Sequence, residues 1–306
     1  MADLLGAGTS RAEETAYTTP TGLGNALDSH CHAWRNWPYQ PPVPDPTSRA
    51  AVEQLLFEMD QHGVDQAVII CARIEHNPDN NDYVAECVRR SPERLHQFVD
   101  VDCSWTPAYQ APGAAERLSV AARTYGVKGF THYVRADDDG TWYLSDEGSA
   151  FFTQAAEQNL IASLALPAHL QPTLREVARR FPSVPILCHH MAGARLEGTA
   201  AASLGEILAS SAIPNIHVKL SGFHYVSRIA WEYPYADCAP IVRALYEHFG
   251  PERLHWGSDY PVLRRAATYG QTLEAVRAHC DFISEDDRAR ILGDSLNALL
   301  ARGANQ

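Results

Sequence analysis

The chain has 306 residues, of which 45% are hydrophobic, and it carries a formal net charge of −12. Such a chain can bury a large core, and its acidic balance argues against nucleic-acid binding, because phosphate contacts need a basic face. Seven cysteines lie far apart without a CxxC pair, as expected for reduced thiols of a cytoplasmic protein. No apolar run predicts an export signal or a membrane span. We expect a protein that acts on small molecules.

Residues 1–24 are rich in small polar residues, glycine and proline, and predict a flexible arm. Eight β-branched or apolar runs follow, with starts at residues 25, 66, 96, 126, 160, 184, 216 and 254. The segments between them predict amphipathic helices, such as the one that Ser48 is expected to cap and Gly63 to end. Strands that alternate with helices predict a parallel sheet, and eight such units predict a single (β/α)₈ TIM-type barrel over residues 25–306. An open doubly wound sheet is the alternative, but no strand is followed by a glycine-rich phosphate loop.

Polar side chains recur at the expected carboxyl ends of the strands, where barrel enzymes carry their chemistry. The first strand has Asp28, His30 and His32 at alternate positions, which predicts one shared face. Asp28 lies deeper than His30 and is expected to orient the barrel interior. The sixth strand ends in His189 and His190, which as neighbours should point to opposite faces, so that at most one can face the centre.

Histidines from the first and sixth strands, together with Asp259 at the end of the eighth, match the nitrogen and oxygen ligands of a divalent metal such as zinc or manganese. The same residues could instead form an acid–base cluster that needs no metal. Five further residues at the same rim are expected to bind substrate: Arg73, His132, Tyr133, Arg135 and His224. The arginines, with Arg195 and Arg228, predict an anionic substrate, because guanidinium groups bind carboxylates in pairs of hydrogen bonds.

The sequence resembles the amidohydrolase superfamily, and within it the amidohydrolase-related lactonases of sugar acids and aromatic-acid breakdown products. The resemblance lies in motifs that follow one another in the family's order: "DSHCHAW", "GVDQAVII", "GVKGF", "FPSVPILCHHMAG", "NIHVKLSG" and "RLHWGSDYPV". It implies a (β/α)₈ barrel in which His30 and His32 form the HxH pair and Asp259 is the eighth-strand aspartate. It also favours His190 over His189, because the family's histidine precedes an apolar residue and a glycine turn, here "HMAG".

The resemblance implies hydrolysis of a lactone or similar ester of a small anionic acid, with Asp259 as general base and His190 in the catalytic cluster. Either one divalent metal or the imidazoles alone would polarise the carbonyl, since some lactonases of the group work without metal. The fourth strand ends in "FTH" instead of the carboxylated lysine of dinuclear members, so a two-metal centre is not expected.

Two alternatives to the lactonase remain open. One is a metal-dependent decarboxylase of an aromatic or muconate-like acid, although the fifth-strand histidine of such enzymes has only His169, slightly beyond the strand, as its counterpart. The other is a barrel that only binds a metal or a metabolite. The sequence also leaves open whether the chain forms a homo-oligomer.

Overall fold

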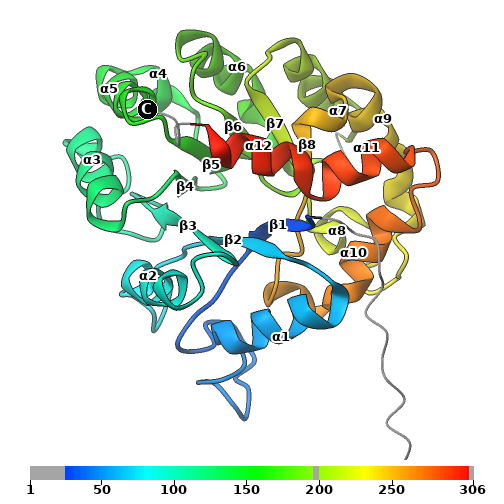
Figure 1. Cartoon of the computed structure of the whole chain (residues 1–306). Helices are drawn as coiled ribbons and strands as arrows, with labels where there is room; N and C mark the ends of the chain where they lie inside the picture. The colour runs from blue at the N-terminus through cyan, green and yellow to red at the C-terminus, as the bar shows by residue number, and fades with distance from the viewer. Residues whose placement is uncertain (1–24, 196–199, 303–306) are drawn as a thin grey trace, which may run out of the picture.

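Eight parallel strands alternate with helices in this protein (Figure 1), whose computed structural model describes residues 25–195 and 200–302. Each strand pairs with its predecessor in the chain, and the strands are β1 (Leu27–Cys31), β2 (Gln66–Ile70), β3 (Leu95–Asp100), β4 (Gly129–Tyr133), β5 (Ile161–Ala165), β6 (Ile186–Cys188), β7 (Ile216–Leu220) and β8 (Leu254–Trp256). Each of the eight predicted runs overlaps one of them, and the predicted (β/α)₈ barrel is confirmed. The predicted arm over 1–24 lies outside the described residues.

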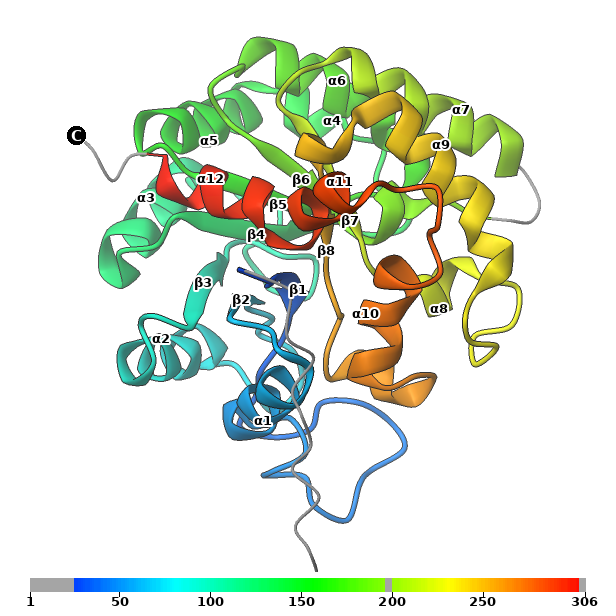
Figure 2. The same ribbon diagram turned by 45° about the vertical axis from the view of Figure 1, so that its right-hand side comes forward.

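The helices surround the strands on the outside of the barrel (Figure 2). They are α1 (Val52–His62), α2 (Asn80–Arg90), α3 (Ala114–Tyr125), α4 (Thr141–Leu144), α5 (Asp146–Glu157), α6 (Gln171–Arg180), α7 (Ala200–Ala209), α8 (Phe223–Val226), α9 (Ala239–Phe249), α10 (Tyr269–Arg277), α11 (Glu285–Ala289) and α12 (Ser295–Ala301). Within the described residues, none of these helices is long and apolar enough to cross a membrane.

The ends of α1 show one correct and one wrong prediction. Gly63 ends the helix as predicted, in a left-handed conformation that glycine adopts without strain, and its N–H donates to the Met59 carbonyl. The predicted cap at Ser48 is wrong, because α1 begins at Val52 and the Ser48 hydroxyl instead donates to the Asp45 carbonyl. Ser48 thus lies in a turn over residues 46–50, before the helix begins.

β8 meets β1 and closes the barrel just beyond their carboxyl ends. A parallel bridge joins Cys31 to Tyr260, and the His32 N–H donates to the Tyr260 carbonyl at 2.6 Å. The Asp259 N–H donates to the His30 carbonyl at 2.7 Å. These backbone bonds place the first-strand histidines beside Asp259, although more than two hundred residues separate them in sequence.

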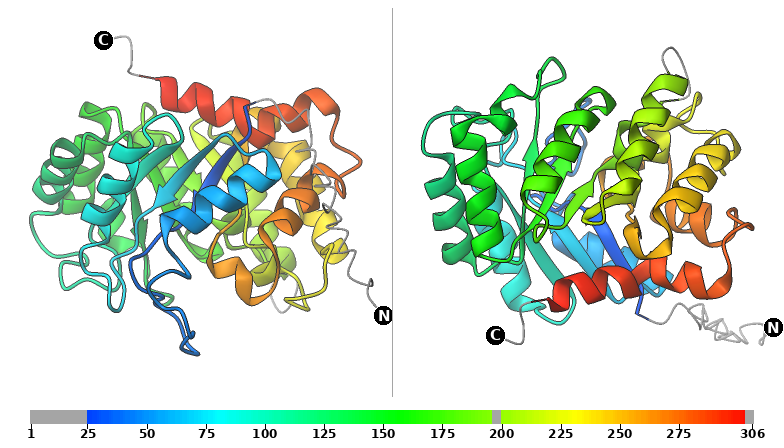
Figure 3. Two further views of the ribbon diagram at one scale, coloured as in Figure 1. Left: turned by 60° about the horizontal axis from the view of Figure 1, so that its bottom comes forward. Right: turned by 90° about the horizontal axis from the view of Figure 1, so that it is seen from above.

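The amino-terminal end of the barrel is filled with apolar side chains. This inner core combines residues of the strands with leucines of α12, which lies across that end (Figure 3): Leu27, Val68, Ile70, Phe98, Ile161, Leu187, Leu296, Leu299 and Leu300. A larger core lies between the strands and the surrounding helices, and all seven cysteines are buried and unpaired, as predicted. The inner cluster at this end is therefore apolar and contains none of the predicted site residues.

Two buried histidines, His217 on β7 and His255 on β8, pair with each other away from the rim. Nδ1 of His217 lies 3.0 Å from Nε2 of His255, so one ring donates and the other accepts. Burial lowers the pKa of His217 to about 3 and that of His255 well below its usual value. Both rings are therefore neutral at pH 7.

Because both rings are neutral in the folded protein, we expect the protein to lose stability as the pH falls. An unfolded histidine titrates near pH 6.5, and His217 in the folded protein near pH 3, so below pH 6.5 the unfolded state binds more protons. The contribution of neutral His217 to the free energy of unfolding is complete above pH 6.5 and is lost progressively as the pH falls towards 3. Between pH 7.5 and pH 5 the free energy of unfolding should fall by about 2 kcal/mol from this group. Urea unfolding should show a smaller pH dependence in His217→Gln, while the same change at the exposed His76 should leave the dependence intact. Equal slopes for wild type and His217→Gln would contradict the assignment.

Candidate active site

Asp259 lies at the centre of a group of histidines at the carboxyl end of the barrel. Its Oδ1 is 3.5 Å from Nε2 of His30, 3.6 Å from Nε2 of His32 and 3.9 Å from Nε2 of His190. Its Oδ2 is 3.9 Å from Nε2 of His224, which follows β7. The structure thus brings the four predicted metal ligands together and adds a fourth imidazole.

Asp28 is not part of this group. A register shift between Asp28 and Cys31 interrupts the alternation along β1, so the prediction of one face shared with His30 and His32 is wrong for Asp28. Its Oδ1 accepts the N–H groups of His30 at 3.0 Å and Ser258 at 2.9 Å, and its Oδ2 accepts the hydroxyl of Tyr269 in α10. Asp28 therefore anchors the backbone that carries His30 and Asp259.

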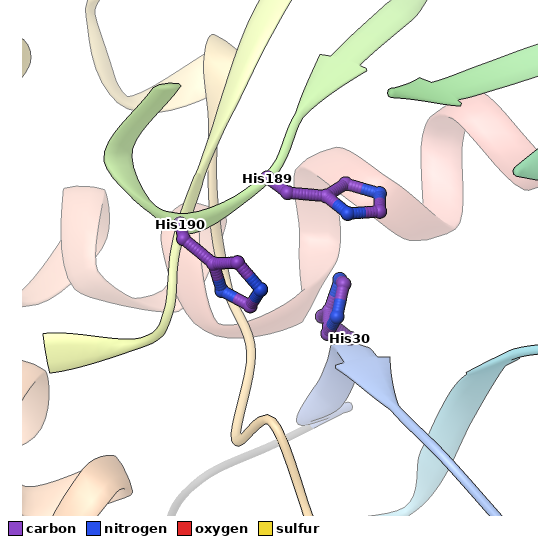
Figure 4. Close-up of side chains that lie close together, drawn as sticks. All are labelled: His30, His189 and His190. Atoms are coloured by element: carbon purple, nitrogen blue, oxygen red, sulfur yellow. The ribbon is translucent and has the colours of Figure 1, made fainter. Parts of the chain in front are cut away.

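Both sixth-strand histidines face the barrel centre, which contradicts the prediction that at most one could. β6 ends at Cys188, and from His190 to Gly193 the chain follows a left-handed turn, with φ of 49° at His190. The strand alternation therefore does not extend to these residues. Figure 4 shows both rings directed towards His30, and the ring centroids of His189 and His190 lie 4.4 and 4.7 Å from that of His30.

Hydrogen bonds at Nδ1 orient the cluster histidines. Nδ1 of His32 lies 2.7 Å from the Ile70 carbonyl, which can only accept, so this ring presents an unprotonated Nε2 when neutral. Nδ1 of His190 lies 3.0 Å from the Ser221 hydroxyl. Such partners fix the tautomer and orientation of metal-binding imidazoles. The Nε2 atoms are consequently turned towards Asp259.

The electrostatics of the cluster favour neutral rings around one carboxylate. Burial lowers the pKa of His190 to about 4 and that of His30 well below its usual value. Burial alone would raise the pKa of Asp259, but the imidazoles of His190, His32 and His224 outweigh burial and hold this pKa below its usual value. Neutral imidazoles and an ionised carboxylate are the forms that bind a divalent cation.

The cluster also meets the other requirements of a cation site. The buried atoms Nε2 of His30 and Oδ2 of Asp259 have no hydrogen-bond partner among the described residues. The ligand atoms of His30, His32 and Asp259 lie within 4.8 Å of one another, as do those of His30, His189 and His190. Nitrogen and carboxylate donors suit zinc and manganese. The residues present therefore fit a single divalent metal.

The structure places the predicted substrate-binding residues in two groups. Tyr133 and His224 belong to the site: the Tyr133 ring lies 5.1 Å from that of His189, and His224 approaches Asp259. His132 is buried between Tyr109 and Trp142, because it alternates with Tyr133 along β4 and points outwards to the helices.

The two predicted arginines also lie away from the cluster. Arg73 is exposed, and its side chain donates to the Pro78 carbonyl beside a different cavity. Arg135 is exposed and stacks over the Tyr109 ring at 4.8 Å. The positions of Arg73, His132 and Arg135 therefore give no support to their predicted role in substrate binding.

A cavity of about 600 Å³ opens beside His189 and His190. It is lined by residues of the β5 and β6 loops, α7 and α8: Ala165, Leu166, Pro167, Ala168, His169, His189, His190, Gly193, Arg195, Ser203, Glu206 and Tyr225. Tyr225 was not predicted; its ring lies 3.9 Å from that of His224 and 5.0 Å from that of His190. A tyrosine in a short helix after β7 gave no sequence signal that separates it from a packing residue.

Aromatic residues of the loop after β1 pack beside His32. Trp34 stacks on His32 with ring centroids 4.9 Å apart, and Tyr39 packs edge-on against Trp34. The guanidinium of Arg265, which was also not predicted, lies 5.9 Å from the centre of the Tyr39 ring. Burial and then the charge of Asp259 raise the pKa of Tyr39, so its hydroxyl is close enough to sense that carboxylate.

Comparison with known proteins finds similar chains over most of this sequence. L-fucono-1,5-lactonase from Burkholderia ambifaria is 30% identical over 285 residues, which cover 87% of this chain and 92% of that protein. An amidohydrolase structure from Burkholderia multivorans with bound zinc has a TM-score of 0.74 and 20% identity, over 90% of this chain and 99% of that chain. The structure of 5-carboxyvanillate decarboxylase from Sphingomonas paucimobilis has a TM-score of 0.63 and 16% identity, over 90% and 98% of the two chains.

At 20% and 16% identity, the two solved structures show a shared fold and no more. The family model described as amidohydrolase matches residues 27–298, from the first residue of β1 into α12. This match includes all eight strands and every member of the cluster around Asp259. The chain therefore belongs to the amidohydrolase family.

Proposed function

We propose that the protein hydrolyses a lactone of a small organic acid. The observation that carries the proposal is the buried Asp259 carboxylate, which touches three imidazoles at 3.5–3.9 Å beside a cavity large enough for a small ring. This arrangement combines a base for water with groups that polarise a carbonyl. The similarity to a lactonase over most of both chains supports a lactone as substrate.

In this mechanism Asp259 accepts a proton from a water molecule, whose oxygen attacks the lactone carbonyl carbon. The carbonyl π electrons move to oxygen, and the resulting anion is stabilised by the polar groups around it. When the tetrahedral carbon collapses, the ring C–O bond breaks and Asp259 returns the proton to the leaving oxygen. The product is a hydroxy acid, which releases one proton to solvent at neutral pH.

His30, His32, His190 and Asp259 would hold the divalent metal. When bound there, a metal supplies Lewis-acid polarisation of the carbonyl and favours the deprotonation of water. The chain's own residues orient the site, since His32 is fixed by the Ile70 carbonyl and His190 by the Ser221 hydroxyl.

Zinc binding by this cluster leads to a specific prediction. His32→Asn removes Nε2 but keeps a donor near the position of Nδ1, and we expect it to weaken zinc binding by at least about 10-fold to 100-fold. Competition with a chromophoric chelator measures this change. The same substitution at the exposed His248 should leave the affinity as in wild type, and an unchanged affinity in His32→Asn would exclude His32 as a ligand.

Two guanidinium groups near the site favour a substrate that carries a negative charge. Arg195 lines the cavity, and Arg265 lies over the Tyr39 ring outside the lining of that cavity. Both are exposed, so they suit a carboxylate or hydroxyl group at the outer end of a substrate rather than at the reacting carbon. A panel of substrates should therefore contain both sugar-acid lactones and lactones that carry a carboxylate.

The residue that would distinguish a decarboxylase from a lactonase is not a member of the histidine cluster. His169, the counterpart of the fifth-strand metal histidine, is exposed, and its Nε2 donates to the Asp138 carbonyl at 2.9 Å. Its Nε2 is therefore occupied outside the cluster around Asp259, although the residue lines the same cavity.

A panel assay separates the proposed function from its alternatives. The zinc-loaded protein is mixed with each lactone, and with aromatic carboxylic acids, while a pH indicator reports proton release and a coupled assay reports CO₂. We expect one proton per lactone consumed and no CO₂. Release of CO₂ from an aromatic acid would establish the decarboxylase instead. If neither the lactones nor the aromatic acids are converted, the alternative that remains is a barrel that only binds a metal or a metabolite.

A further inference from the structure

His189 has no role in the mechanism above, although it lies inside the site. It is 2% exposed, its ring lies between His30 and Tyr133, and it lines the cavity. Its Nδ1 is buried without a hydrogen-bond partner among the described residues. A buried polar group without a hydrogen-bond partner lowers the stability of a folded protein, unless a bound ligand supplies the partner.

A chain of hydrogen bonds determines what this nitrogen offers. Lys219 is fully buried, and its Nζ donates to the Ser163 hydroxyl oxygen at 2.7 Å. The Ser163 oxygen lies 2.6 Å from Nε2 of His189. A hydroxyl oxygen can accept twice, but the hydrogen of Ser163 has no acceptor other than Nε2 of His189 among the described residues, so donation to Nε2 is the arrangement that uses both groups.

This pattern leaves Nδ1 of His189 with a hydrogen. A neutral imidazole that accepts at Nε2 carries its hydrogen on Nδ1, which is therefore a donor. Figure 4 shows the His189 ring directed into the space that it shares with His30 and His190. The donor therefore belongs to the same polar pocket in which the lactone carbonyl would be polarised.

We propose that the Nδ1–H group of His189 is a further hydrogen-bond donor to the carbonyl oxygen of the lactone, with Ser163 and Lys219 as positioning residues. The proposal rests on the proposed lactonase function. It gives the site a donor from the protein itself, fixed before the reaction begins, where negative charge develops on the carbonyl oxygen. In such a preorganised site, the donor acts on the transition state more than on substrate binding.

A pair of substitutions at His189 tests the donor. Asn has its side-chain amide near the position of Nδ1 and can still donate, whereas Leu cannot. We expect His189→Leu to lower kcat about 10²-fold to 10³-fold with KM within about threefold, and His189→Asn to recover most of the loss. Equal losses in both variants, or no loss in His189→Leu, would overturn the proposal.

Zinc affinity distinguishes this role from metal ligation, because His189 also lies in a group that could hold a metal. The zinc affinity of His189→Leu, measured by chelator competition, should stay within about threefold of wild type. A tenfold or larger loss would make His189 a ligand and would overturn its role as a donor.

A spectroscopic measurement tests the donor without any substrate. In zinc-loaded protein labelled with ¹⁵N in its histidines, long-range ¹H–¹⁵N correlation should show His189 with a protonated Nδ1 and an unprotonated Nε2. The resonance is assigned by its loss in His189→Asn, and Ser163→Ala should disturb this tautomer. A bare Nδ1 with a protonated Nε2 would overturn the proposal. If the protonated Nδ1 is found but no lactone is turned over, the proposed function fails while the donor itself remains.

Discussion

Substituting asparagine for Asp259 is expected to lower kcat/KM for lactone hydrolysis by about 10³-fold or more. General-base catalysis contributes about 10²-fold to 10⁴-fold, and the amide cannot accept the proton of the attacking water. The asparagine also removes the one carboxylate among the histidines of the cluster, so the metal would lose its only anionic ligand. Steady-state rates measured by proton release check the expectation.

Two controls separate this effect from unfolding and from metal loss. Asp281 is exposed on the surface, and its replacement by asparagine should leave the rate as in wild type. The zinc content and thermal midpoint of Asp259→Asn are measured beside its rate. Full turnover in a folded Asp259→Asn variant would exclude Asp259 as the base.

Replacing Asp28 by alanine is expected to destabilise the protein by about 3–5 kcal/mol. The carboxylate is fully buried and accepts three hydrogen bonds, from the N–H groups of His30 and Ser258 and from the Tyr269 hydroxyl. Each buried donor that loses its acceptor costs about 1–3 kcal/mol. Urea unfolding at pH 7 measures the loss.

Asparagine at the same position provides the matched control. Both backbone bonds use Oδ1, which the asparagine side chain retains, so Asp28→Asn should lose only about 1 kcal/mol. Because Asp28 does not face the cavity, Asp28→Asn should also keep most of its activity when folded. Equal destabilisation by alanine and asparagine would show that these bonds do not anchor the junction of β1 and β8.

The barrel could be predicted from sequence because its signals are local and repeated. Each strand is a short apolar run, each helix has its own periodic pattern, and eight such units at similar spacing suit a closed barrel. The positions of His30, His32 and Asp259 could also be predicted from the sequence, since all three lie at the carboxyl end of a predicted strand. That end is one rim in any parallel barrel.

Errors arose where the backbone departs from a regular strand. Residues 189 and 190 do not alternate, because β6 ends at Cys188 and the following turn is left-handed. The register shift in β1 similarly interrupts the alternation that would have placed Asp28 on one face with the histidines. A sequence pattern assigns alternate faces only while the strand continues. The turn after β6 contains Gly193, but this glycine comes three residues after His190 and does not show where the strand ends.

The arginines could not be assigned because loop side chains are positioned by distant contacts. Arg73 follows β2 and Arg135 follows β4, yet their guanidiniums contact Pro78 and Tyr109 instead of the cluster. Arg265 lies over the ring of Tyr39, although more than two hundred residues separate the two in sequence. Such pairings depend on the three-dimensional course of the loops, which periodicity does not describe.

Hydrolysis in water enriched in ¹⁸O tests the central claim most directly, namely that water attacks the lactone carbonyl. The zinc-loaded protein is given a lactone identified in the panel, and the product is analysed by mass spectrometry with fragmentation. Attack at the carbonyl carbon places one ¹⁸O atom in the carboxylate and none in the new hydroxyl group. Label in the hydroxyl group, which requires attack at the alkyl carbon of the ring, would contradict the account.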